Sequence, residues 1–203
     1  IVLNGFGEQS VIDGHVADLQ AKGVRVIYHG ADMSKPDQIK AMVQVAEGEF
    51  GAIDILVNNA GFQNVQPIEE FSAEKWDGLL AVILSSGFHT IQAALPGMRK
   101  RGWGRIINMG SAHAHVASPF KSGYVAAKHG VMGLTKAVAL EVAQENITCN
   151  AICPGYVKTP LVEGQIGDTA KARGMSEEEV VRDVLLAAQW TKKFVSIEQI
   201  AGL

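Results

Sequence analysis

Short apolar runs alternate with longer helical segments along this chain. Runs typical of buried strands stand at 1–3, 24–28, 53–57, 105–109 and 147–152. Segments with apolar residues at helical spacing separate them, at 10–22, 35–50, 72–101 and 123–144, and Gly87 and Pro96 are expected to interrupt the third. Strands that alternate with helices of this length favour parallel pairing, because each helix crosses over the sheet between one strand and the next. The pattern predicts an α/β fold in which helices cover both faces of a parallel sheet.

The composition excludes several classes of function. A chain of 203 residues suits a single domain with a sizeable core. Its formal net charge of −3 gives no electrostatic reason to expect nucleic acid or an anionic membrane as a partner. The longest uninterrupted apolar run, 79–84, is far shorter than a bilayer span. The two cysteines, Cys149 and Cys153, do not make a zinc site by themselves, and we interpret them as reduced thiols of a cytoplasmic protein.

Tyr124 and Lys128 form the pair with the clearest chemical meaning. Four residues apart on a predicted helix, they share one face about one turn apart. A lysine ammonium beside a phenol favours the phenolate, so we expect the pKa of Tyr124 to be lowered toward the working pH. Such a tyrosine can act as general acid and base, and Ser111, which follows the run 105–109, can donate to the same substrate oxygen. Taken alone, the pair is better explained by a surface tyrosine beside a solvated lysine.

Four blocks of sequence together change that interpretation. They are Asn58-Asn-Ala-Gly61, Ser111, Tyr124 with Lys128, and Pro154-Gly155 followed by Thr159. In order and spacing these blocks resemble the short-chain dehydrogenase/reductase family over essentially the whole chain. The resemblance implies a Rossmann-type, doubly wound sheet and hydride transfer at a nicotinamide. It also implies that 1–203 is one domain of this family, with Ser111, Tyr124 and Lys128 as its catalytic residues.

Two departures from the family pattern matter. The glycine-rich phosphate loop that joins the family's first strand to its first helix has no counterpart here, and 1–3 resembles the family's second strand. We therefore expect a fold truncated at both ends, without the phosphate loop and without the last strand. The second departure is Ile83, which stands where the family usually has an asparagine whose amide shapes the helix and holds a water. Isoleucine has no hydrogen-bonding atom, so we expect a slower proton relay to Lys128.

Within the family, the resemblance is to members that interconvert D-3-hydroxybutyrate and acetoacetate. The residues that carry it are Gln63, His113, Lys121 and Gln165, with Tyr156 where this group commonly has tryptophan. We expect these side chains to converge near Tyr124 and to bind a small carboxylate, with Lys121 as a point charge. A hydrogen bond to a charged group contributes about 1.5–3 kcal/mol, enough to select an acid over its neutral analogue. The alternative interpretation makes Lys121 and Gln165 solvated surface residues.

NAD is the predicted cofactor. The turn 4–7 contains neither arginine nor lysine to meet a 2′-phosphate, and it also lacks the usual acidic partner for the ribose. The resemblance places Asp32 and Met33 beside the adenine, and Val157 and Thr159 at the carboxamide. The full set of expected cofactor-binding residues is Phe6, Asp32, Met33, Asn59, Ala60, Gly61, Tyr124, Lys128, Pro154, Gly155, Val157 and Thr159. No metal site is expected.

The polar segment at about 159–190 is a candidate substrate lid, because it follows the carboxyl end of a predicted strand. A mobile surface loop is the alternative. The predicted function is that of an NAD-dependent dehydrogenase acting on D-3-hydroxybutyrate. The alternatives are a reductase of a 3-oxoacyl thioester or a sugar, and a catalytically weak nucleotide-binding protein. Members of the family are commonly tetramers, so the resemblance also implies a homotetramer.

Overall fold

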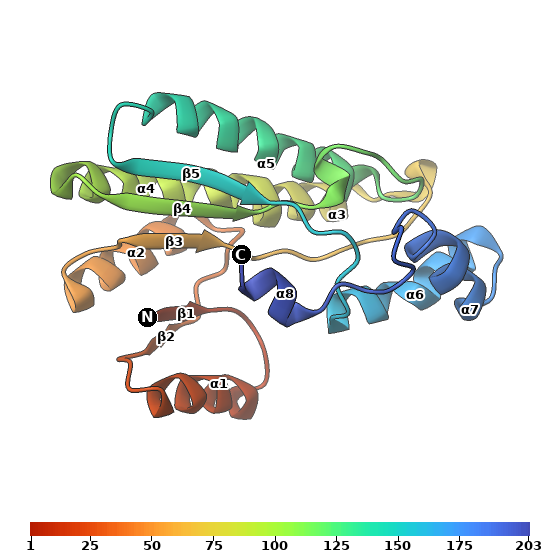
Figure 1. Ribbon diagram of the computed structural model, residues 1–203, viewed down its shortest axis with the longest axis horizontal. Helices are drawn as coiled ribbons and strands as arrows, with labels where there is room; N and C mark the ends of the chain where they lie inside the picture. The colour runs from red at the N-terminus through yellow and green to blue at the C-terminus, as the bar shows by residue number, and fades with distance from the viewer.

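The computed structural model describes all 203 residues. Strands and helices alternate along the chain, as the apolar runs predict (Figure 1). The strands are β1 (Val2–Asn4), β2 (Ile27–His29), β3 (Ile55–Asn58), β4 (Gly104–Met109) and β5 (Ile147–Ile152). The α-helices are α1 (Gln9–Ala21), α2 (Pro36–Phe50), α3 (Ala73–Leu79), α4 (Ser86–Arg101), α5 (Ser122–Glu141), α6 (Pro160–Arg173), α7 (Glu177–Glu179) and α8 (Ile197–Ala201). Shorter turns are the 3-10 helices η1 (Ile68–Glu70) and η3 (Ala112–Ala114) and the π-helices η2 (Leu80–Ser85) and η4 (Val180–Leu185).

Parallel pairing is confirmed, but the strands form two separate sheets. β4 lies between β3 and β5 in a three-stranded sheet, where Ile106 stands opposite Leu56 on one side and Cys149 on the other. β1 and β2 pair in a second sheet and form no ladder with β3. Figure 1 shows this pair on the side of β3 that faces away from β4. Because β3, β4 and β5 run in the same direction, their carboxyl ends meet at one edge of the sheet.

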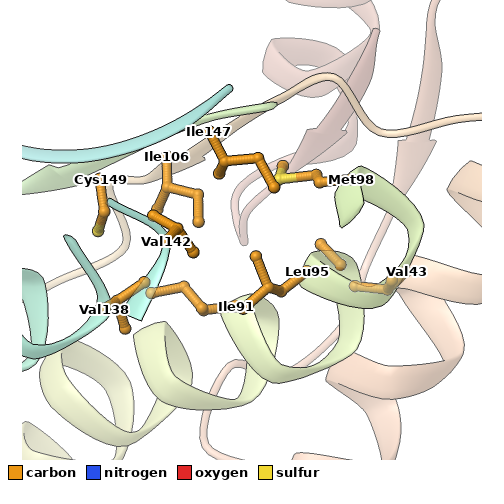
Figure 2. Close-up of a cluster of buried hydrophobic side chains, with 10 residues drawn as sticks. Val43, Ile91, Leu95, Met98, Ile106, Val138, Val142, Ile147 and Cys149 are labelled. Atoms are coloured by element: carbon orange, nitrogen blue, oxygen red, sulfur yellow. The ribbon is translucent and has the colours of Figure 1, made fainter. Parts of the chain in front are cut away.

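The main core lies on one face of the three-stranded sheet. Ile106 of β4 is fully buried there, and in Figure 2 it faces Ile91 and Leu95 of α4 across the cluster. Each fully buried aliphatic side chain of this kind stabilises the fold by about 1.5–3 kcal/mol. The cluster consists of Val43, Ile91, Ala94, Leu95, Met98, Ile106, Val138, Val142, Ile147 and Cys149. Helices α2, α4 and α5 therefore cover this face and hold it in place.

The opposite face of the three-stranded sheet is largely open. Ile55 and Val57 of β3 point to this side and are 58% and 53% exposed. Helix α1 buries none of its residues, although the sequence predicts an apolar side for it. The prediction that helices cover both faces is therefore confirmed for one face only. The reason is that β1, β2 and α1 lie apart from β3 and do not cover Ile55 and Val57.

The long helical region begins as predicted but is interrupted at another place. Ser72 caps its first turn, because the serine oxygen accepts a backbone N–H three residues later. The sequence predicts interruptions at Gly87 and Pro96, and that prediction is wrong: both lie inside the regular helix α4. The actual irregularity is the wide π-helical turn η2, which comes before them. Such turns are frequent at functional sites.

The continuous stretch Ala73–Arg101 is also long and apolar enough, by length and composition, to cross a membrane. In the structure, 44% of its most apolar window is buried inside the protein. Ile91 and Met98 pack in the main core, and Leu79 and Ile83 pack against α5. A core helix of a globular domain has the same length and composition, and this stretch is packed as a core helix.

A network of side-chain hydrogen bonds connects α4 and α5 to the carboxyl ends of β3 and β4. Asn108 of β4 accepts from Asn58 Nδ2 at 2.8 Å and donates to Thr135 Oγ1 of α5 at 2.9 Å. Thr90 of α4 donates to Asn58 Oδ1 at 2.7 Å. A buried polar group without a hydrogen-bond partner destabilises the fold, whereas a fully paired network makes it more rigid. These hydrogen bonds therefore fix α4 and α5 relative to the ends of β3 and β4.

Candidate active site

Ser111, the predicted catalytic serine, lies directly after β4. It is 8% exposed, and its side-chain oxygen accepts the backbone N–H of His113 at 3.1 Å, which caps the turn η3. Just before it, the Gly110 N–H donates to the Ile152 carbonyl at 2.7 Å. A Cβ at Gly110 would lie only 2.6 Å from Cys153 Sγ. The loop is therefore held tightly against β5, and this contact sets the position of the Ser111 hydroxyl.

Tyr124 and Lys128 lie in the first two turns of α5, and Tyr124 shares a cavity wall with Ser111. The Lys128 ammonium donates to the Met109 carbonyl at 2.6 Å and lies 5.5 Å from the centre of the Tyr124 ring. Helix α5 packs closely against α3 because residue 123 is glycine: a Cβ there would lie 2.8 Å from Leu79 Cδ1. The structure thus brings together the three side chains that the sequence motif predicts.

The predicted lowering of the Tyr124 pKa is wrong for this structure. Burial raises the pKa of Tyr124 above its ordinary value, and the nearby Ser111 hydroxyl opposes the rise only in part. The Lys128 ammonium gives no such help, because it is directed at the Met109 carbonyl rather than at the phenol oxygen. Burial also lowers the pKa of Lys128 to about 8. Desolvation therefore outweighs the attraction between ammonium and phenolate that the sequence argument relied on.

A small cavity of about 70 Å³ lies against Ser111 and Tyr124. Every side chain that the sequence predicts for substrate binding lines it, although they come from separate loops and helices. These residues are Gln63, His113, Lys121, Tyr156 and Gln165. Pro154 and Gly155, predicted to bind cofactor, also line the cavity, together with Ala112, Leu161 and Val162. Its small volume suits a small substrate.

Lys121 provides the charge of this cavity. The side chain is 3% exposed; its ammonium donates to Gln165 Oε1 at 2.8 Å and lies 3.4 Å from the Tyr156 hydroxyl. No ion pair in the protein includes Lys121. Burial and repulsion from Arg173 lower the pKa of Lys121 to about 8. A buried ammonium without an anionic partner is unfavourable, so the cavity is prepared to receive an anion.

His113 also lines the cavity, as a neutral ring. It is 8% exposed, and burial together with the Lys121 charge lowers its pKa to about 4. The ring meets both tyrosines edge to face, with centroids 6.0 Å from Tyr124 and 6.2 Å from Tyr156. A neutral imidazole offers one N–H donor and no charge. His113 therefore adds one directional N–H donor and no positive charge to the cavity.

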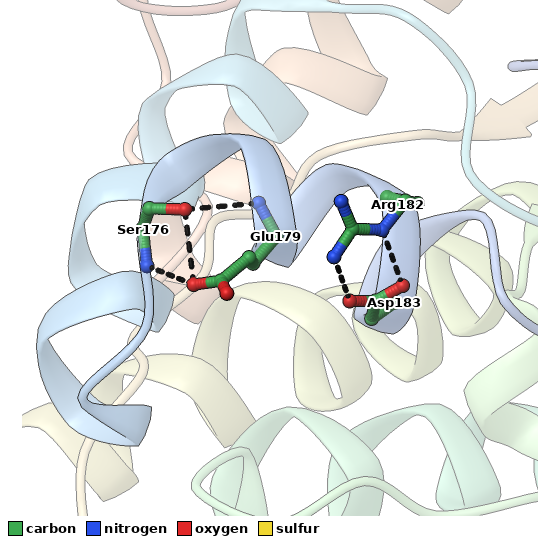
Figure 3. A network of polar contacts seen from close by, with 4 residues as sticks. All are labelled: Ser176, Glu179, Arg182 and Asp183. Carbon is green, nitrogen blue, oxygen red and sulfur yellow. Dashed lines mark hydrogen bonds and ion pairs between the residues drawn. The ribbon is translucent and has the colours of Figure 1, made fainter.

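The candidate lid, residues 159–190, is mostly helical. Thr159 caps the first turn of α6, and Ser176 and Glu179 form a reciprocal capping box at α7 (Figure 3). Ala170, Val180 and Leu185 form a small buried cluster against which Tyr156 packs. Because α6 also supplies Gln165, the lid helices and the aromatic wall of the cavity form one packed unit.

A larger depression lies elsewhere on the lid. It has a volume of about 840 Å³ and runs from Ile166 along 177–192, past Arg182 and Asp183, which pair with each other in Figure 3. None of the residues predicted for catalysis or substrate binding lines it. The chemistry therefore belongs to the smaller cavity, where the buried polar groups converge.

The backbone of Val157 shows whether the protein can bind the carboxamide of a nicotinamide. It stands opposite Val195 in an isolated parallel bridge, whose hydrogen bonds use the Tyr156 carbonyl and the Lys158 N–H. The N–H and C=O of Val157 itself point to the other side and form no hydrogen bond within the chain. A free donor beside a free acceptor matches a primary carboxamide. The backbone of Val157 therefore fits a nicotinamide carboxamide at the position that the sequence predicts, and Thr159 lies two residues further along.

The remaining cofactor residues follow the carboxyl ends of strands. Asn59, Ala60 and Gly61 come after β3, whereas Phe6 follows β1 and Asp32 and Met33 follow β2. Phe6 is 74% exposed. Because β1 and β2 form no ladder with β3, the structure does not join these last three residues to the catalytic residues through one sheet. Their contact with the adenosine stays a prediction.

Ile83 lies within the π-helical turn η2. It is 5% exposed and packs against Leu79, Ala127 and Val131. The wide turn forms here although residue 83 carries no side-chain amide. Apolar packing against α5 holds the turn instead. The slower proton relay to Lys128 stays a prediction.

Sequence reasoning missed Ser118 and the apolar wall of the cavity. Ser118 Oγ lies 2.9 Å from His113 Nε2, and Leu161 and Val162 enter the cavity from the first turn of α6. A serine in the loop before α5 belongs to no motif, and two apolar residues at a helix start have no local signal of ligand contact. Only the folded arrangement identifies them.

Comparison with known proteins gives concordant matches. The sequence pattern of the short chain dehydrogenase family matches residues 8–169. The chain is 58% identical to a D-beta-hydroxybutyrate dehydrogenase of Rhizobium meliloti (strain 1021), over 100% of this chain and 79% of the relative. It is 49% identical to a D-beta-hydroxybutyrate dehydrogenase of Cupriavidus necator, over 100% of this chain and 78% of the relative.

The fold is also found in a solved structure. A variant of actinorhodin polyketide ketoreductase, crystallised with NADPH, superposes with a TM-score of 0.91 at 30% identity, and the match covers 99% of this chain and 77% of that one. This likeness confirms the Rossmann-type α/β architecture. Because the family pattern covers most of the chain and the relatives match its whole length, this protein is a member of the short-chain dehydrogenase family.

Proposed function

We propose that the protein interconverts D-3-hydroxybutyrate and acetoacetate with NAD as the hydride carrier. The observation that carries this proposal is the buried Lys121 ammonium, which has no anionic partner and shares a small cavity with Ser111 and Tyr124. The names of the relatives from Rhizobium meliloti and Cupriavidus necator support the same substrate.

Ser111, Tyr124 and Lys128 are the proposed catalytic residues. In oxidation, Tyr124 takes the proton of the substrate hydroxyl while Ser111 donates a hydrogen bond to the same oxygen. A nicotinamide bound beside them supplies the acceptor for the hydride that leaves the carbinol carbon. The Ser111 hydroxyl favours the phenolate that this step needs and opposes in part the rise in pKa that burial imposes on Tyr124, and Lys128 holds the loop before Ser111 through the Met109 carbonyl. In reduction, the same groups act in the opposite direction.

The carboxylate of the substrate is proposed to bind at Lys121 and the polar residues beside it in the cavity. The Lys121 ammonium offers a charge-assisted hydrogen bond to the carboxylate, and the Gln63 and Gln165 amides offer directional donors in the same cavity, which the His113 ring also lines. A 3-oxoacyl thioester, the alternative class of substrate, has no carboxylate to pair with Lys121. The aromatic ring of Tyr156 closes the cavity beside these groups, which favours a short carbon chain.

NAD is proposed over NADP from the turn after β1. Residues 4–7 contain no arginine or lysine that could pair with a 2′-phosphate. The ketoreductase of similar fold was crystallised with NADPH, so the proposal of NAD rests on this turn and not on the fold. A homotetramer and a cytoplasmic location stay predictions of the family resemblance and of the reduced cysteines.

The pH dependence of substrate selection tests this function. Below pH 8 Lys121 is an ammonium and pairs with the carboxylate; above about pH 8 the residue of the free enzyme loses its proton and the pairing weakens. We therefore expect the ratio of kcat/KM for D-3-hydroxybutyrate to kcat/KM for its methyl ester to fall as the pH rises through about 8. Both kcat/KM values are obtained with NAD from the absorbance of the reduced nicotinamide that forms. The ratio cancels the titration of Tyr124 and Lys128, because both substrates need these groups equally. A ratio near one that does not change with pH would contradict the function.

A further inference from the structure

The His113 ring lies between two serine hydroxyls. Its Nδ1 is 3.5 Å from Ser111 Oγ, and its Nε2 is 2.9 Å from Ser118 Oγ. Ser111 and His113 line the substrate cavity, whereas Ser118 does not. The nitrogen on the catalytic side is therefore Nδ1, and the nitrogen on the outer side is held by Ser118.

The state of His113 depends on these two contacts. Burial keeps the ring neutral at pH 7, so one nitrogen carries the hydrogen and the other carries a lone pair. Which nitrogen is protonated is set by the hydrogen bond that the other one makes. Ser118 can donate its hydroxyl hydrogen to a bare Nε2, and the hydrogen of the ring then stands on Nδ1, toward Ser111.

The hydrogen bonds of Ser111 follow from the same choice. A serine hydroxyl has one hydrogen to donate and two lone pairs to accept with, and Ser111 Oγ already accepts the His113 backbone N–H at 3.1 Å. A hydrogen on Nδ1 faces the second lone pair of Ser111 and leaves the serine hydrogen free for the substrate oxygen beside Tyr124. A bare Nδ1 would instead attract the serine hydrogen away from the substrate.

We propose that Ser118 is a positioning residue for the reaction. By donating to Nε2 of His113 it holds the imidazole as the Nδ1–H tautomer, and this tautomer directs the Ser111 hydrogen to the reacting oxygen of the substrate. The inference rests on the proposed function only for the identity of the substrate, since the tautomer is a property of the protein.

Nitrogen-15 NMR of histidine-labelled protein tests the tautomer without any substrate. In the wild type, the long-range proton–nitrogen pattern of His113 is expected to show a protonated Nδ1 and a bare Nε2. Ser118→Ala removes the donor and should shift the ring toward the Nε2–H tautomer, whereas Ser118→Thr keeps a hydroxyl and should retain Nδ1–H. A wild-type ring protonated on Nε2, or a Ser118→Ala variant with an unchanged pattern, would overturn the inference.

Steady-state kinetics with NAD supply the second readout. Loss of one orienting hydrogen bond is expected to lower kcat about tenfold in Ser118→Ala. Because the effect passes through Ser111 rather than through the carboxylate, kcat should fall by the same factor for the methyl ester, and Ser118→Thr should restore it. Ser10→Ala, on the exposed face of α1, is the matched control and should behave as the wild type. An unchanged kcat in Ser118→Ala would also overturn the role of Ser118. Failure of D-3-hydroxybutyrate as a substrate would leave the NMR result readable.

Discussion

Replacing Tyr124 with phenylalanine is expected to lower kcat for D-3-hydroxybutyrate about 10²- to 10⁴-fold, the usual contribution of a positioned general acid and base. The phenylalanine ring keeps the contact with the His113 ring and the packing beside Leu79 and Ile83, so the fold should persist. KM should change little, because Lys121 and Gln165 still bind the carboxylate. Initial rates of reduced nicotinamide formation at saturating substrate measure the effect.

Tyr28→Phe is the matched control for this variant. Its hydroxyl donates to the Gly5 carbonyl at an exposed position in the turn after β1, and Tyr28 does not line the cavity, so the control is measured at saturating NAD. Near-normal kcat is expected for the control. If Tyr124→Phe kept its kcat within a few fold of the wild type, Tyr124 would not be the group that moves the substrate proton.

The second large effect is expected from Lys121→Met. Methionine keeps most of the apolar length of lysine but has no charge, so the variant removes the anion partner while filling the same space. The lost charge-assisted hydrogen bond, about 1.5–3 kcal/mol, corresponds to a fall of about 10- to 150-fold in kcat/KM for the acid. For the methyl ester, kcat/KM should stay the same or rise, because the ester no longer meets a buried unpaired ammonium.

Thermal unfolding of the same variant provides an independent check. Removing a buried charge that has no anionic partner should leave the protein at least as stable as the wild type. Lys171→Met, at an exposed position of α6, is the control and should change neither substrate. Equal losses for the acid and the ester would show that Lys121 supports the cavity without selecting the carboxylate.

Much of the site could be predicted from sequence because the fold gathers strand ends. Ser111, Gly61 and Pro154 each follow a strand of one parallel sheet, so their neighbourhood follows from the order of strands and helices. The helical spacing of Tyr124 and Lys128 then places both beside that edge. The convergence of Lys121 with Gln165, far apart in the chain, came from the family resemblance, and the structure shows their hydrogen bond at 2.8 Å.

Other features depend on three-dimensional surroundings that no local pattern records. The pKa of Tyr124 is set by burial and by the direction in which Lys128 points, and the sequence argument assumed a different direction. The irregular turn η2 contains Ile83, which packs against α5, whereas Gly87 and Pro96 predict a break further along. Ser118 is recognised only by its distance to His113 Nε2.

One arrangement is central to the proposed function: a carboxylate paired with Lys121 while the reacting oxygen stands between Ser111 and Tyr124. A crystal structure of the protein with NAD and acetoacetate measures this directly. We predict a carboxylate oxygen within hydrogen-bond distance of Lys121 Nζ, about 2.7–3.2 Å, and the keto oxygen within reach of both hydroxyls. A complex in which Lys121 still bonds only to Gln165 and Tyr156, with the carboxylate directed elsewhere, would contradict the account.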